Sequence, residues 1–156
     1  MTPLLVHVPR SLPGSGKSTL ARRLAGETGA VRVSLDVHRR RVWPDCPPAW
    51  CPFVGRGLWV QQSFEQELRQ LLADGHDVVC DRTSLSVEGP ARLRGIAAEF
   101  GARVVVHDLT SISAETCIAR DAARPERERV GAAAIWAKHA EYRDRLAAEA
   151  AMAGAA

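Results

Sequence analysis

The sequence lacks a long apolar run and has only two lysines, Lys17 and Lys138, among its 21 lysine and arginine residues. No stretch approaches the roughly 20 apolar residues that a membrane-spanning helix needs. A secretory signal is also missing, because Met1 leads through a short apolar segment directly to Pro9. These absences predict a cytoplasmic protein without a membrane segment. The 156 residues suffice for one domain with a real core, spanning 1–156.

Cysteine is too sparse to indicate a zinc site or a disulfide framework. Of the four cysteines, Cys46 and Cys51 stand close together in DCPPAWC, but no second pair at zinc-ligand spacing follows. Reduced thiols are therefore favoured, with a metal at Cys46 and Cys51 as the open alternative. The net charge of +3 is compatible with an anionic ligand without requiring one.

Short apolar runs alternate with helical patterns along the chain. The runs at 4–8, 31–35, 77–81 and 103–109 are typical of strands, and helical patterns cover 17–28, 59–74, 88–100, 113–123 and 131–150. This alternation predicts an α/β fold with a four-stranded parallel sheet flanked by helices. The segment 43–57 has four prolines, two tryptophans and no period, so we expect a functional irregular segment there.

The stretch SLPGSGKST, residues 11–19, predicts a phosphate-binding loop between a strand and a helix. Ser11 stands where glycine usually opens this pattern. The glycines let backbone N–H groups approach phosphate oxygens, and the helix N-terminus adds partial positive charge. Lys17 would contact the β- and γ-phosphates of ATP, and the Ser18 hydroxyl would ligate Mg²⁺. The predicted nucleotide-binding residues are Pro13, Gly14, Ser15, Gly16, Lys17, Ser18 and Thr19.

Candidate residues also follow the second and third predicted strands. In parallel sheets ligands lie beyond the carboxyl ends of the strands, where Asp36, Arg39 and Asp81 are expected. Asp36 could accept a proton from an attacking hydroxyl, or it could cap a helix. Asp81 could order Mg²⁺ through water, or it could orient Arg39.

A lid is predicted near residues 120–130. Arg120 and Arg124 are four residues apart and share a helix face before Pro125, so they could close over ATP and stabilise charge on the transferred phosphoryl group.

These motifs together resemble the P-loop polynucleotide 5′-hydroxyl kinases over roughly residues 4 to 142. The resemblance implies that Asp36 is the general base, that Arg39 contacts the acceptor phosphate, and that Asp81 positions Arg39. It also implies that Arg120 and Arg124 are lid arginines. Where family members often have D-x-T-N, this chain has Asp81, Arg82, Thr83 and Ser84.

The predicted function is Mg²⁺-dependent transfer of the ATP γ-phosphate to the 5′-hydroxyl of RNA or DNA. Catalysis is assigned to Asp36, Lys17, Arg39 and Arg124, and Arg40 and Trp43 join Asp36, Arg39 and Asp81 in binding the acceptor. Trp43, Trp50 and Phe53 could instead form a small core under the loop. A small-molecule kinase of the same fold and a non-catalytic ATP-binding regulatory module are the alternatives, and the oligomeric state stays open.

Overall fold

The computed structural model describes residues 2–45, 54–83 and 88–155, and these form four strands and six α-helices. In chain order the elements are β1 (Leu5–Arg10), α1 (Lys17–Thr28), β2 (Val31–Ser34), α2 (Leu35–Val42), α3 (Val54–Ala73), β3 (Val78–Asp81), α4 (Glu88–Glu99), β4 (Arg103–Asp108), α5 (Ala114–Ala122) and α6 (Ala132–Gly154), with a short 3₁₀ helix at Glu126–Glu128 before α6.

The strands form one parallel sheet in the order β2-β3-β1-β4, which confirms the predicted α/β fold and its four-stranded parallel sheet. Pro9 lies inside the central strand β1. This is tolerated because β1 pairs with β3 only at Val6 and His7, whereas its pairing with β4 continues to Arg10.

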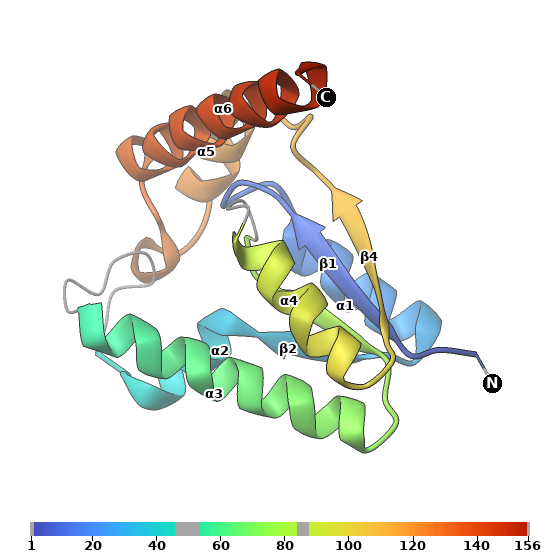
Figure 1. Cartoon of the computed structure of the whole chain (residues 1–156). Helices are drawn as coiled ribbons and strands as arrows, with labels where there is room; N and C mark the ends of the chain where they lie inside the picture. The colour runs from blue at the N-terminus through green and yellow to red at the C-terminus, as the bar shows by residue number, and fades with distance from the viewer. Residues whose placement is uncertain (1, 46–53, 84–87, 156) are drawn as a thin grey trace.

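Helices cover both faces of the sheet (Figure 1). On one face α3 and α4 pack on β1–β3 through a core that includes Val8, Phe64, Leu68 and Leu93. On the other face α1 packs through Ala21 and Leu24 against Val79. Helices α5 and α6 lie over the end toward which the strands point, so the loop after β1 sits beneath them (Figure 1).

The structure corrects three sequence predictions. Helix α2 begins directly after β2, where 31–35 was expected to be strand, because the Ser34 hydroxyl caps it by accepting from the Val37 N–H at 3.4 Å. Helix α3 begins at Val54, inside the segment expected to be irregular. Helix α6 continues to Gly154, beyond the predicted end at 150.

Several sequence predictions concern residues outside the described part of the chain, namely Cys46, Trp50, Cys51, Phe53 and Ser84. In the described part, Cys80 and Cys117 are buried free thiols, and burial raises the pKa of Cys80 to about 12. Within the same residues, no three His, Cys, Asp or Glu side chains gather as a metal site, and no helix is long and apolar enough to span a bilayer.

Candidate active site

The loop after β1 has the backbone that a phosphate cradle requires. Gly14 and Gly16 have φ angles of 83° and 92°, in the left-handed region that favours glycine. A Cβ on Gly14 would lie 2.3 Å from the Cys117 carbonyl oxygen of α5. Gly14 is therefore needed for the close packing of α5 on the loop as well as for its own turn.

The predicted loop residues surround the start of α1. Pro13 and Ser15 are buried, Lys17 opens the helix with its side chain largely buried, and Thr19 is exposed. The buried Ser15 hydroxyl has no hydrogen-bond partner within the described residues. This loop therefore presents a helix N-terminus, a lysine and an unpaired hydroxyl at one place.

Ser11, the departure from the glycine pattern, is fully buried at the loop entry. Its backbone N–H donates to the Thr83 carbonyl oxygen at 2.9 Å. This contact fixes the loop entry beside the carboxyl end of β3. Because the donor is a backbone N–H, serine makes this contact as glycine would.

Asp81 joins the loop to the sheet edge. One carboxylate oxygen accepts the Ser18 hydroxyl at 3.1 Å and lies 4.0 Å from Lys17 Nζ. The other accepts from Arg32, whose Nε is 2.9 Å away. Asp81 therefore lies beside Ser18, the residue predicted to ligate Mg²⁺, and its arginine partner is Arg32 and not the expected Arg39.

Arg32 was not singled out from the sequence. It lies in the middle of β2, one of the strands that the alternating pattern predicts, and its partner Asp81 is 49 residues away. A charged residue inside an otherwise apolar strand was the available signal, because such a side chain usually has a buried partner.

Asp36 and Arg39 form a pair on the first turns of α2, with Arg39 Nη1 2.5 Å from Asp36 Oδ1. Because Ser34 caps the helix, Asp36 is not the cap, and its side chain is 46% exposed. An exposed, oriented carboxylate just beyond β2 is free to meet a ligand. Arg40 is exposed on the same helix, and the half-buried Trp43 ends it by donating its backbone N–H to Arg39.

His38 anchors α2, and the sequence predictions did not use it. Its buried ring places Nδ1 2.8 Å from the Ser63 hydroxyl, places Nε2 against the Glu67 carboxylate, and meets Phe64 edge-on. All three partners belong to α3. The helix that carries Asp36 and Arg39 is thus fixed to the adjacent helix.

The two predicted lid arginines occupy different positions. Arg120 donates to the Ser15 carbonyl oxygen at 3.0 Å and so touches the phosphate loop, whereas Arg124 lies 3.7 Å from the Asp121 carboxylate. Buried Asp121 accepts the backbone N–H groups of Val130 and Gly131 at 2.9 to 3.1 Å. Asp121 therefore ties both ends of the 123–131 turn together, a role that only the tertiary contacts reveal.

Helix α6, together with α5, packs against the loop after β1. The Arg10 guanidinium lies 5.1 Å from the centre of the Tyr142 ring and 3.7 Å from Glu149. Leu12 of the loop packs in one cluster with Cys117 of α5 and Ile135 of α6. The phosphate loop and the two last helices therefore form one packed unit.

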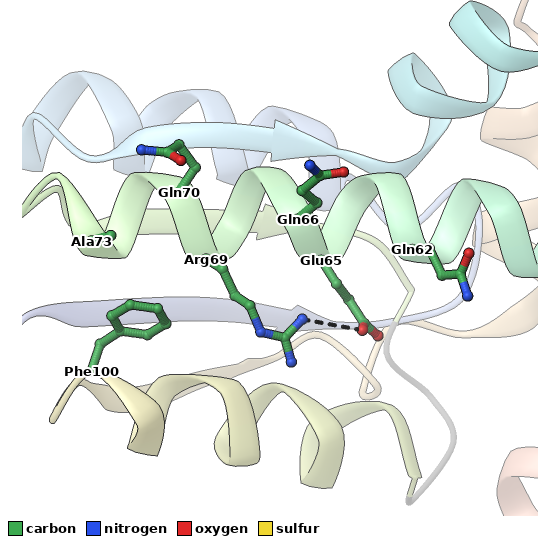
Figure 2. A pocket seen from close by; sticks show the side chains of 7 residues that line it. All are labelled: Gln62, Glu65, Gln66, Arg69, Gln70, Ala73 and Phe100. Atoms are coloured by element: carbon green, nitrogen blue, oxygen red, sulfur yellow. Dashed lines mark ion pairs between the residues drawn. The ribbon is translucent and has the colours of Figure 1, made fainter.

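A shallow groove of about 450 Å³ lies elsewhere, between α3 and the end of α4 (Figure 2). Its walls include Glu65 and Arg69, which form an ion pair at 3.7 Å. Burial would raise the pKa of Glu65, but hydrogen bonds from Arg92 and Gln61 outweigh it and lower that pKa. None of the candidate site residues lines this groove. Its carboxylate, that of Glu65, is already held in ion pairs.

Almost the whole chain matches a known protein family. Residues 6–148 match the family AAA_33, described as an AAA domain. Uncharacterized proteins of Mycobacterium tuberculosis (Rv2004c) and Mycobacterium bovis (Mb2027c) are 31% identical over 145 residues, covering 83% of this chain. The chain spans only 28% of the length of these relatives.

Several solved kinases share the fold. A chain of the Pnkp1/Rnl/Hen1 RNA repair complex superposes with a TM-score of 0.75 and 22% identity, over 93% of this chain and 47% of that one. The APS kinase CysC of Mycobacterium tuberculosis gives 0.59 at 23% identity, over 77% and 70% of the two chains. A gluconokinase of Sinorhizobium meliloti gives 0.54 at 18% identity, over 87% and 72%. The protein has the P-loop kinase fold.

Proposed function

The chain belongs to this AAA domain family, and on that premise we propose that it transfers the γ-phosphoryl group of ATP to the 5′-hydroxyl end of RNA or DNA. The observation that carries the proposal is the Asp36–Arg39 pair, placed beyond β2 at the sheet edge where Lys17, Ser18 and Asp81 meet. A phosphate loop alone needs no such pair. A kinase needs a carboxylate for the acceptor hydroxyl.

The donor half of the site fits ATP and Mg²⁺. The N–H groups around Gly14 and Gly16, the N-terminus of α1 and Lys17 would hold the phosphates. Ser18 would ligate Mg²⁺ through its oxygen while its hydroxyl continues to donate to Asp81, the present acceptor at 3.1 Å. When bound, Mg²⁺ neutralises charge on the β- and γ-phosphate oxygens.

The acceptor half would work through Asp36. Its carboxylate takes the proton of the acceptor hydroxyl as the acceptor oxygen bonds to the γ-phosphorus, and the bond to the bridging oxygen breaks so that ADP leaves with the electron pair. Arg39 keeps the carboxylate oriented through the 2.5 Å contact. Lys17, Arg39 and Arg124 would stabilise the charge that develops on the transferred group.

The polynucleotide acceptor is supported by two further facts. Helix α2 has three consecutive arginines next to the proposed base, which suits acceptor phosphates. The structural neighbour with a TM-score of 0.75 belongs to an RNA repair complex. Arg40 and Trp43 would bind the first nucleotides of the acceptor.

The test is transfer of labelled γ-phosphate from ATP and Mg²⁺ to a 5′-hydroxyl single-stranded oligonucleotide. We expect label on this strand, none on the same strand with a 5′-phosphate, and none with Lys17→Ala. The absence of labelled strand, with ATP binding confirmed, would refute the polynucleotide acceptor. Slow ATP hydrolysis with no labelled acceptor would then favour a nucleotide-binding regulatory module.

A small-molecule hydroxyl is the second candidate acceptor. It is favoured by the fold similarity to an APS kinase and a gluconokinase, which cover 77% and 87% of this chain. The chemistry at Asp36 would be unchanged. Failure of single-stranded oligonucleotides to compete with the true acceptor would support this candidate.

A further inference from the structure

We propose that Arg41, Leu58 and Trp59 form a surface, the α2–α3 strip, that binds single-stranded nucleic acid beyond the reacting 5′ end. The inference rests on the proposed function, because the strand would leave the site along α2. It concerns residues that the chemistry itself does not use. The strip would favour long acceptors over short ones.

The relative placement of α2 and α3 brings the two halves of the strip together. Helix α2 runs toward the N-terminal end of α3, antiparallel to it (Figure 1). His38 contacts Ser63 on α3. One turn forward on α2 reaches Arg41, and one turn back on α3 reaches Trp59, so these two residues lie at the same level.

Trp59 is not explained by the core. Its side chain is 65% exposed and that of Leu58 is 54% exposed, whereas the next residue, Val60, and Phe64 are buried in the core face of α3. Isolated exposed apolar residues are ordinary, but two consecutive exposed apolar residues near a basic helix leave apolar surface that the core does not use. Indole rings offer a flat face on which any base can stack.

The charge of the strip fits a polyanion. Arg39 is engaged with Asp36, but Arg40 and Arg41 are exposed, and neither forms an ion pair with any residue that the structure describes. A guanidinium group without an ion pair among the described residues, at the level of a stacking ring, matches a phosphate followed by a base. A protein partner would need carboxylates and an apolar side chain at the same spacing, so nucleic acid is the occupant we argue for.

The distance from the reaction centre sets the expected strand length. Helix α2 has eight residues and is therefore about 12 Å long at about 1.5 Å per residue. At about 3.4 Å or more per nucleotide, the strip lies within about four nucleotides of the end held by Asp36. A dinucleotide would reach Arg41 at most, and it would react without contacting Trp59.

The experiment compares phosphoryl transfer to a dinucleotide and to a single strand of about twelve nucleotides, together with equilibrium binding of the 5′-phosphorylated strand. We expect Trp59→Ala to weaken binding of the long strand about 5- to 150-fold, the range for loss of one stacked base. Transfer to the dinucleotide should be unchanged. Trp59→Phe should keep most of the affinity, and Trp59→Leu should not.

Salt dependence tests the arginine of the strip. Replacing Arg41 by alanine should lower the slope of log affinity against log salt by about 0.7, the value for one phosphate contact on a single strand. Arg94→Ala removes an exposed arginine on α4 and serves as the matched control, with no change in slope.

The outcomes separate the strip from the proposed function. Transfer to both acceptors with no effect of Trp59→Ala would overturn the strip and leave the function standing. Transfer to neither acceptor, with long-strand binding still dependent on Trp59, would overturn the function and support the strip. Equal affinity of Trp59→Leu and Trp59→Phe for the strand would reject base stacking at this position.

Discussion

At the scale of single residues, the two aspartates of the candidate site, Asp36 and Asp81, differ in burial. Asp81 is buried and has three partners, Arg32, Ser18 and Lys17, whereas Asp36 is nearly half exposed and has Arg39. A buried carboxylate with fixed partners suits a structural or metal-ordering role. An exposed one can meet a substrate, which separates the two aspartates by environment alone.

We expect Arg32→Met to destabilise the protein by about 2 kcal/mol, because it leaves the buried Asp81 carboxylate without its closest partner. The loss should be smaller than for a fully buried pair, since the guanidinium is 25% exposed. Urea unfolding at unchanged m-value measures it. The control is Arg23→Met, which breaks the exposed pair with Glu27 and should change stability by under about 0.5 kcal/mol. Equal losses in the two variants would contradict the role of Arg32.

At the scale of elements, the phosphate loop and α5 depend on one another. Gly14 turns the loop and also admits the Cys117 carbonyl, and Arg120 of the same helix donates to the Ser15 carbonyl oxygen. The conformation of the loop and the position of α5 are therefore coupled through direct contacts.

Gly14→Ala and Gly29→Ala form a matched pair. Both glycines have positive φ, but a Cβ on Gly29 would meet nothing within 4 Å. We expect Gly29→Ala to cost about 1 kcal/mol of stability from backbone strain, and Gly14→Ala to cost at least about twice as much because α5 must shift. Denaturant unfolding gives both values. Similar losses would show that the packing of Cys117 on the loop adds nothing.

Helices and strands were predictable from the sequence where apolar residues recur regularly. The helix that follows a strand without a separating loop was missed. All four strands and five helices followed from apolar patterns. Helix α2 was missed because β2 passes into it at Ser34 without an intervening loop residue. Roles that depend on distant contacts, such as those of Arg32 and Asp121, could not be predicted, since their partners come together only in the fold. The phosphate loop was predictable because its chemistry is local.

At the scale of the whole molecule, we expect two imidazoles to make stability dependent on pH. His7 of β1 and His107 of β4 lie 3.0 Å apart through Nδ1 and Nε2. Burial lowers the pKa of both below the usual value of 6.5, and for His107 the nearby His7 adds to the effect. Neutral rings can share one hydrogen bond, whereas two protonated rings would repel.

The unfolded chain therefore binds more protons than the folded chain between the lowered pKa values and about 6.5. Stability should be complete above pH 6.5 and should fall as the pH drops through that range. Urea unfolding at a series of pH values measures this slope. His107→Asn should flatten it, and an unchanged slope in that variant would exclude the histidine pair as its source.

The central claim is that Asp36 serves as the base at a phosphoryl-transfer site built on the loop at 11–19. Its most direct test is the rate of γ-phosphate transfer by Asp36→Asn, measured beside the affinity for ATP. We predict a loss of about 10²- to 10⁴-fold in transfer, because asparagine cannot accept the proton, with ATP affinity nearly unchanged. Transfer by Asp36→Asn at the rate of the unaltered protein would contradict the account.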